Sequence, residues 1–216
     1  MTIKERALKV CNELKKIYPD AKCTLKYNKP YELVIATRLS AQCTDARVNI
    51  VTDILFKKYT TLRSFAESDI NELEGYVRPC GFYKTKAKNI KDMCIQLIER
   101  FDGIVPDNIE NLLSLPGVGR KTANLIVGDI YGKPAIVTDT HCIRIAGRLG
   151  LTDSNGPHKV ENDLKKVIPE EEGSDFCHRI VEFGREICKA RKPLCEICTL
   201  NSICRYYIEN KKGEKK

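Results

Sequence analysis

The sequence predicts an all-α protein, and two observations lead to that prediction. Apolar residues recur three and four positions apart over most of the chain, which is the spacing of helices with one buried face. Stretches that alternate apolar and polar residues are few, so a large β-sheet is not expected. The length of 216 residues is enough for one large domain or for two smaller ones, and a hydrophobic fraction of 42% is enough to form a core.

The helices can be placed in order by this periodicity and by their capping residues. Asp107 and Glu110 are spaced as a capping box at the start of one helix. Thr138, Asp139 or Thr140 is in position to cap another. In chain order, the expected helices cover residues 3–17, 32–39, 46–59, 87–101, 108–113, 120–130, 140–149, 159–167 and 174–189.

The charge balance and the cysteine count narrow the functional classes. Lys and Arg number 37 against 29 Asp and Glu, a formal net charge of +8, which favours a polyanionic partner such as nucleic acid. No export signal and no apolar run long enough to span a bilayer is found, so we expect a cytoplasmic protein that does not bind membranes. Eleven cysteines in such a protein favour a metal or cluster over disulfides.

A tight hairpin is predicted between the helices over residues 108–113 and 120–130, at the sequence LPGVGRK. Gly117 and Gly119 let the main chain turn sharply and approach a ligand closely. The free N–H groups at the start of the next helix favour an anion such as a phosphate. Lys121, in the first turn of that helix, adds an amine that can act as a nucleophile. The segment resembles a helix-hairpin-helix element, although an ordinary corner between helices has the same pattern.

A second segment repeats this pattern faintly. Residues 81–90, GFYKTKAKNI, share glycine, a basic residue, alanine and isoleucine with residues 117–126, GVGRKTANLI, at matching offsets. Two interpretations remain open: two ordinary corners between helices, or two turns that bind a phosphate backbone, one of them degenerate.

Asp139, eighteen residues after Lys121, also has two interpretations. It either caps the helix that follows or faces Lys121 across a cleft. In the second case the pair can break the N-glycosidic bond between C1′ of a nucleoside and its base. The carboxylate stabilises the positive charge that develops on the sugar or deprotonates the nucleophile, and the amine attacks C1′ and becomes a Schiff base.

Four cysteines near the end of the chain have ligand-like spacing. Cys188, Cys195, Cys198 and Cys204 follow the pattern C-x6-C-x2-C-x5-C. Four thiolates this close can hold zinc or an iron–sulfur cluster, and the spacing does not decide between them.

Taken together, these motifs resemble the bifunctional DNA glycosylases of the endonuclease III family. The resemblance rests on the hairpin and on VTDTH at residues 137–141, and it extends through LSAQCTD at residues 39–45 to ARKPLC at residues 190–195. It implies base excision repair of damaged double-stranded DNA, with oxidised pyrimidines of the thymine glycol type as substrates. Lys121 is then the Schiff-base nucleophile and Asp139 the essential carboxylate, with strand cleavage 3′ to the abasic site by β-elimination.

The resemblance also implies the architecture and the cofactor. One helical domain comprises residues 21–131, and the other joins residues 1–20 to residues 132–216, with DNA in the cleft between them. The cysteine pattern matches the family's [4Fe–4S] cluster loop. The protein is expected to act as a monomer, associated with the nucleoid when bound to DNA. The turn that grips DNA is expected to consist of Gly117, Val118, Gly119 and Arg120.

Two further positions are expected to hold the duplex once a base has been flipped out. The resemblance places Gln42 where an amide fills the gap, although a surface or capping role is an alternative. Phe82 stands where the family often has an aliphatic wedge, and it either inserts into DNA or packs in the core. Asp45 matches a position near the damaged base or caps a helix. The helix after Phe82 carries lysines that either pair with phosphates or form a solvated face, namely Lys84, Lys86, Lys88 and Lys91.

Two rival functions share some of these motifs. A relative that only removes a base, such as an adenine or mismatch-thymine glycosylase, has the hairpin, the aspartate and usually the cluster, but lacks a lysine at position 121. A non-catalytic DNA-binding module uses the hairpin alone and has no reason to pair Lys121 with Asp139. The sequence therefore favours the bifunctional enzyme.

Overall fold

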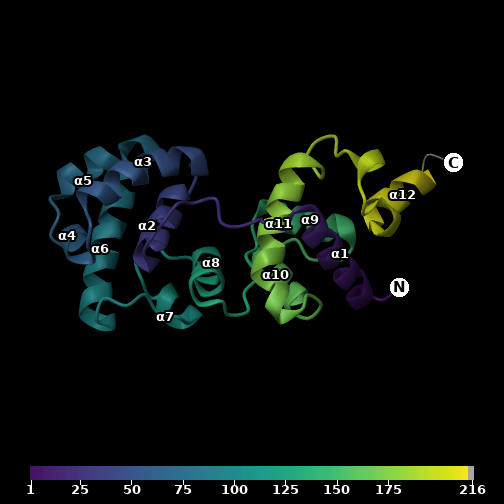
Figure 1. Cartoon of the computed structure of the whole chain (residues 1–216), viewed down its shortest axis with the longest axis horizontal. Coiled ribbons are helices and arrows are strands. Elements are labelled where there is room, and N and C mark those ends of the chain that lie inside the picture. Colours follow the sequence, from purple (N-terminus) through teal and green to yellow (C-terminus); the bar gives the residue numbers. More distant parts are fainter. Residues whose placement is uncertain (214–216) are drawn as a thin grey trace. The chain divides into compact units, whose positions relative to one another are not determined.

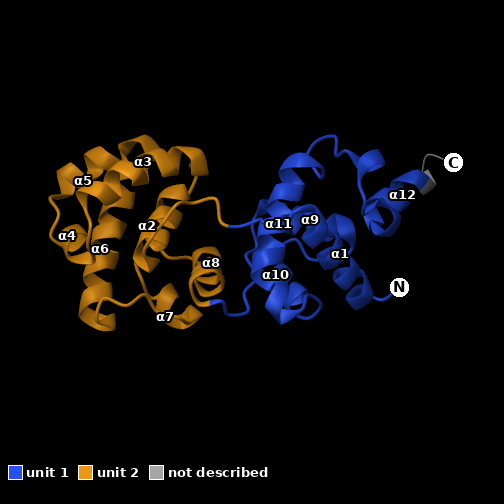
Figure 2. Ribbon diagram, in the orientation of Figure 1, with its two compact units in different colours: residues 1–22, 132–216 blue, residues 23–131 orange. Residues whose placement is uncertain are grey.

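A computed structural model describes residues 1–213 of the chain. These residues form α-helices and short 3-10 helices joined by turns, with no β-strand in the described part (Figure 1), which confirms the predicted all-α fold. The helices gather in two compact units (Figure 2): unit 2 is Cys23–Tyr131, and unit 1 is Met1–Lys22 with Gly132–Lys216. None of the helices within residues 1–213 has the length and apolar composition needed to cross a bilayer.

Unit 2 is organised around α2 (Pro30–Ser40), which is buried on nearly all sides. The consecutive residues Leu33, Val34 and Ile35 are fully buried, as expected of a helix at the centre of a domain. Helices α3, α6 and α8 pack against it. The other elements of unit 2 are α3 (Asp45–Lys58), α4 (Leu62–Ala66), α5 (Ile70–Val77), η1 (Arg78–Cys80), α6 (Tyr83–Phe101), α7 (Ile109–Leu113) and α8 (Arg120–Tyr131).

The structure differs from the prediction at several places in unit 2. Helices α4 and α5 were not predicted, because five and eight residues are too few for a clear periodicity. Both are stabilised by packing against α6, which itself begins at Tyr83 rather than at residue 87. The capping box with Asp107 is wrong: Asn108 caps α7, and its side chain accepts the N–H of Asn111 at 2.9 Å.

Unit 1 packs α1 (Ile3–Ile17) against α11 (Gly173–Glu186). Helix α1 has the predicted bounds and begins with a capping box between Thr2 and Glu5. Helix α11 ends before Cys188, earlier than predicted, and α12 was not predicted. The other elements of unit 1 are α9 (Thr140–Leu149), α10 (Pro157–Lys165), η2 (Glu170–Glu172), η3 (Cys195–Ile197), η4 (Asn201–Ile203) and α12 (Arg205–Gly213).

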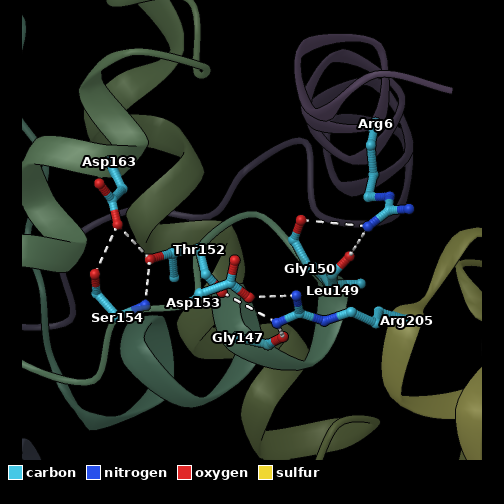
Figure 3. A network of polar contacts seen from close by, with 9 residues as sticks. All are labelled: Arg6, Gly147, Leu149, Gly150, Thr152, Asp153, Ser154, Asp163 and Arg205. Atoms are coloured by element: carbon cyan, nitrogen blue, oxygen red, sulfur yellow. Dashed lines mark hydrogen bonds and ion pairs between the residues drawn. The ribbon is translucent and has the colours of Figure 1, made fainter.

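Two arginines hold the C-terminal end of α9 (Figure 3). Arg6 from α1 donates to the main-chain oxygens of Leu149 and Gly150 at 3.3 and 3.2 Å. Arg205 from α12 donates to the oxygen of Gly147 at 3.0 Å. Cations at a helix C-terminus satisfy its unpaired carbonyl groups and complement its dipole. Helix α9 is therefore anchored at one end, and its opposite end carries Asp139.

Candidate functional site

The segment between α7 and α8 forms the tight turn that the sequence predicts. The main-chain oxygen of Leu115 accepts the N–H of Val118 at 3.2 Å. Gly117 has a φ of 76°, in the left-handed region that favours glycine. Helix α8 begins at Arg120, directly after the turn. Its first N–H groups have no acceptor within the helix, and this arrangement favours an anion at the start of α8.

The turn rests on a polar support from two other helices. A Cβ atom at position 117 would lie 2.9 Å from Cδ and Nε of Arg38 and 3.1 Å from Cβ of Asn89. Arg38, on α2, donates to the side-chain oxygen of Asn89, on α6, at 3.1 Å. Two features therefore favour glycine at position 117: the left-handed main-chain conformation and the close approach of Arg38.

Gly117→Ala is expected to lower the free energy of unfolding by about 2–5 kcal/mol. About 1–2 kcal/mol arises from the left-handed conformation, and about 1–3 kcal/mol from displacing well-packed neighbours. Urea unfolding measures the change. Gly119→Ala is the matched control, because its Cβ meets no atom within 4 Å, and a loss below about 1 kcal/mol is expected there. Equal losses in the two variants would show that Arg38 does not constrain the turn.

The residues expected to grip DNA occupy different environments. Gly117 and Gly119 are exposed, and Arg120 is half-buried. The side chain of Val118 is only 8% exposed, and its N–H is used within the turn. Val118 thus anchors the turn from inside. Lys121 is exposed in the first turn of α8.

Asp139 is the N-cap of α9. Its Oδ1 accepts the N–H of Cys142 at 2.7 Å, so the capping interpretation is confirmed for Asp139 and not for Thr138 or Thr140. The segment before it is held by burial of Ala135, Ile136 and Val137. A cap of this kind fixes the carboxylate at the start of the helix, half-buried and with Oδ2 outside the capping bond.

Gln42 and Phe82 lie on two turns with the same unusual main-chain conformation. Gln42 has a φ of 55° and Phe82 a φ of 48°, both in the left-handed region. Phe82 is 67% exposed, so the interpretation that it packs in the core is wrong. Gln42 is exposed and lies between α2 and α3. Thr44, not Asp45, caps α3, and Asp45 instead accepts a hydrogen bond from the Thr24 hydroxyl at 2.6 Å.

The lysines on α6 are not equivalent. Lys88 is on the solvated face, where it pairs with Asp92 at 2.7 Å. Lys86 is 1% exposed, so neither interpretation from the sequence applies to it. Sequence reasoning missed this residue because its burial results from contacts with segments far along the chain.

The four cysteines with ligand-like spacing surround one cavity in unit 1. Cys188, Cys195, Cys198 and Cys204 line it together with Arg148 and apolar side chains. Within residues 1–213, no three His, Cys, Asp or Glu side chains are arranged to hold a single metal ion. Four thiols that line one cavity match the donor set of an iron–sulfur cluster.

The thiols of this cavity are held in the neutral form until positive charge lies beside them. Burial, followed by the charges of the other cysteines, raises the pKa of the Cys198 thiol to about 11. Iron is bound by thiolates, which form readily only beside positive charge. Arg148 supplies part of that charge, since its Nη1 donates to Sγ of Cys188 at 3.4 Å, and the iron of a bound cluster supplies the rest.

The chain matches two known protein families, one over its central part and one over the cysteine segment. The family described as "HhH-GPD superfamily base excision DNA repair protein" matches residues 35–170. The "Iron-sulfur binding domain of endonuclease III" matches residues 188–204, which begin and end at two of the four cysteines. Endonuclease III from Synechocystis sp. is 47% identical over 93% of this chain and 92% of its own length. This chain belongs to the endonuclease III family.

Other relatives agree. Endonuclease III from Bacillus subtilis is 43% identical over 93% of this chain and 90% of its own length. A solved structure described as a trapped endonuclease III–DNA covalent intermediate has a TM-score of 0.90 and 44% identity, and covers 98% of this chain and 100% of its own. As a member of the endonuclease III family, the chain is a bifunctional DNA glycosylase and AP lyase, and Cys188, Cys195, Cys198 and Cys204 fit its [4Fe–4S] cluster.

Proposed function

We propose that this glycosylase removes oxidised pyrimidines of the thymine glycol type and then cuts the DNA strand 3′ to the abasic site. The observation that carries the proposal is the position of Lys121, exposed in the first turn of α8 directly after the glycine turn. A turn that binds the phosphates of one strand brings an adjacent flipped sugar within reach of this amine. The solved structure of a covalent endonuclease III–DNA intermediate supports the same chemistry here.

The proposed reaction proceeds through a Schiff base on Lys121. The Nζ lone pair forms a bond to C1′ as the bond from C1′ to the damaged base breaks, and the base leaves with the electron pair of that bond and takes up a proton from water. The Asp139 carboxylate stabilises the positive charge that develops on the sugar. The nitrogen then loses one proton, its lone pair displaces O4′ from C1′, and O4′ takes up a proton, so the sugar ring opens to a protonated imine. Loss of a C2′ proton then allows the C3′–oxygen bond to break, and the 3′ phosphate leaves.

DNA binding is proposed to use two kinds of contact. Gly117, Gly119 and Arg120 present main-chain N–H groups and positive charge to the phosphates, and Val118 supports them from inside the turn. Such contacts position the enzyme without reading sequence. Gln42 and Phe82 enter the gap left by the flipped base, where an exposed aromatic ring can stack. The enzyme is proposed to act as a monomer on nucleoid DNA in the cytoplasm, with damaged duplex DNA as its partner.

Borohydride trapping tests this proposal directly. Reduction of the imine is expected to link the holoenzyme covalently to duplexes with thymine glycol or other oxidised pyrimidines, while an undamaged duplex of the same sequence forms no adduct. The readout is a protein–DNA band of reduced mobility on a denaturing gel. Base removal without any adduct would contradict the lyase mechanism, and no base removal from the whole panel would contradict the substrate class.

A further inference from the structure

Lys86 makes two hydrogen bonds that join distant parts of unit 2. It lies on α6 and is 1% exposed. Its ammonium donates to the main-chain oxygen of Leu39 at 2.8 Å and to that of Cys80 at 2.7 Å. Burial lowers the pKa of this ammonium. A buried charge is costly unless it is well hydrogen-bonded, so this position requires an explanation.

The two acceptors are the ends of the elements that lead into the inserting loops. Leu39 is in the last turn of α2, three residues before Gln42, and Cys80 ends η1, two residues before Phe82. The carbonyl groups in the last turn of a helix lack partners within it and attract a cation. One ammonium therefore holds the starting points of both loops.

Both loops need such a support. Gln42 and Phe82 have positive φ values of 55° and 48°, and a non-glycine residue keeps this conformation only where its surroundings impose it. Both residues are also exposed. The main-chain bonds of Lys86 fix the chain just before each of them without covering either side chain.

We propose that Lys86 is a positioning residue that holds the Gln42 and Phe82 loops at the separation needed to enter the gap left by a flipped base. This inference rests on the proposed function, since it takes Gln42 and Phe82 as the inserting residues. It predicts that Lys86 contributes to recognition of a gapped base stack and not to general affinity for the phosphate backbone.

The test compares the affinity of each variant for two duplexes. One contains a tetrahydrofuran abasic analogue, which needs the gap to be filled, and the other is undamaged. The ratio compared is the affinity for the abasic-analogue duplex divided by the affinity for the undamaged duplex. Lys86→Met is expected to lower this ratio about tenfold, with unchanged affinity for undamaged DNA. Lys88→Met is the matched control, because it removes the same charge from an exposed position, 74% accessible, on the same helix, and its ratio is expected to equal that of the wild type.

A second measurement separates positioning from a purely structural role. In a Gln42→Ala background, Lys86→Met is expected to lower the affinity ratio by a much smaller factor than it does in the wild-type background, because the Gln42 loop no longer contributes to binding. If Lys86→Met does not fold, Lys86→Gln replaces it, since the shorter side chain keeps a polar group but does not reach both carbonyl groups. A wild-type ratio in either variant, equal losses on both duplexes, or full additivity with Gln42→Ala overturns the inference. Each of these results would leave borohydride trapping by the wild type unchanged. Failure of the Lys86 inference is therefore distinguishable from failure of the proposed function.

Discussion

Lys121→Gln is expected to abolish borohydride trapping and to lower strand cleavage at an abasic site by at least about 10³-fold, the scale on which loss of a nucleophile acts. The amide of glutamine has no lone pair able to form an imine. Binding to an undamaged duplex is expected to persist, because the turn before α8 remains in place. The measurements are trapping yield, single-turnover cleavage and affinity for the same DNA.

Lys84→Gln is the matched control for this substitution. Lys84 is also exposed in the first turn of a helix that follows a glycine turn, because it lies just after Gly81 at the start of α6. The same change in charge and shape there is expected to leave trapping intact. Trapping by Lys121→Gln at the yield of the control would assign the nucleophile to another amine.

Asp139→Asn is expected to slow base removal by about 10²–10⁴-fold, the range typical of a positioned acid–base group. The substitution isolates the charge, because asparagine is as good an N-cap as aspartate and can still accept the N–H of Cys142. Thermal stability is therefore expected to stay close to that of the wild type. Single-turnover release of thymine glycol measures the rate, and affinity for DNA is measured separately.

Asp139→Ala provides the comparison, since it removes the cap as well as the charge. It is expected to lose about 1 kcal/mol of stability and to be as slow as Asp139→Asn in base removal. Wild-type turnover by Asp139→Asn together with a loss of stability in Asp139→Ala would reduce Asp139 to a capping residue.

The fold and much of the candidate site could be predicted from local patterns. Helices α1 and α9 have the predicted bounds, because their apolar residues follow the helical repeat and polar residues cap them. The turn before α8 and the four cysteines are also local, since each motif is contained in a short stretch of chain. Lys121, at the exit of the turn, could be singled out for the same reason.

The tertiary structure decided what depends on contacts between distant segments. Phe82 is exposed and Lys86 is buried, although both are close together at the start of α6. Gly117 rests on Arg38 from another helix, and α4 and α5 are held by α6. The sequence by itself determined the class of fold, because helical periodicity is a local property. It also singled out Lys121 and the four cysteines as candidates, because each lies in a motif contained in a short stretch of chain. Which lysine supports the loops, and which aromatic ring faces solvent, was decided by packing between elements, which no local pattern encodes.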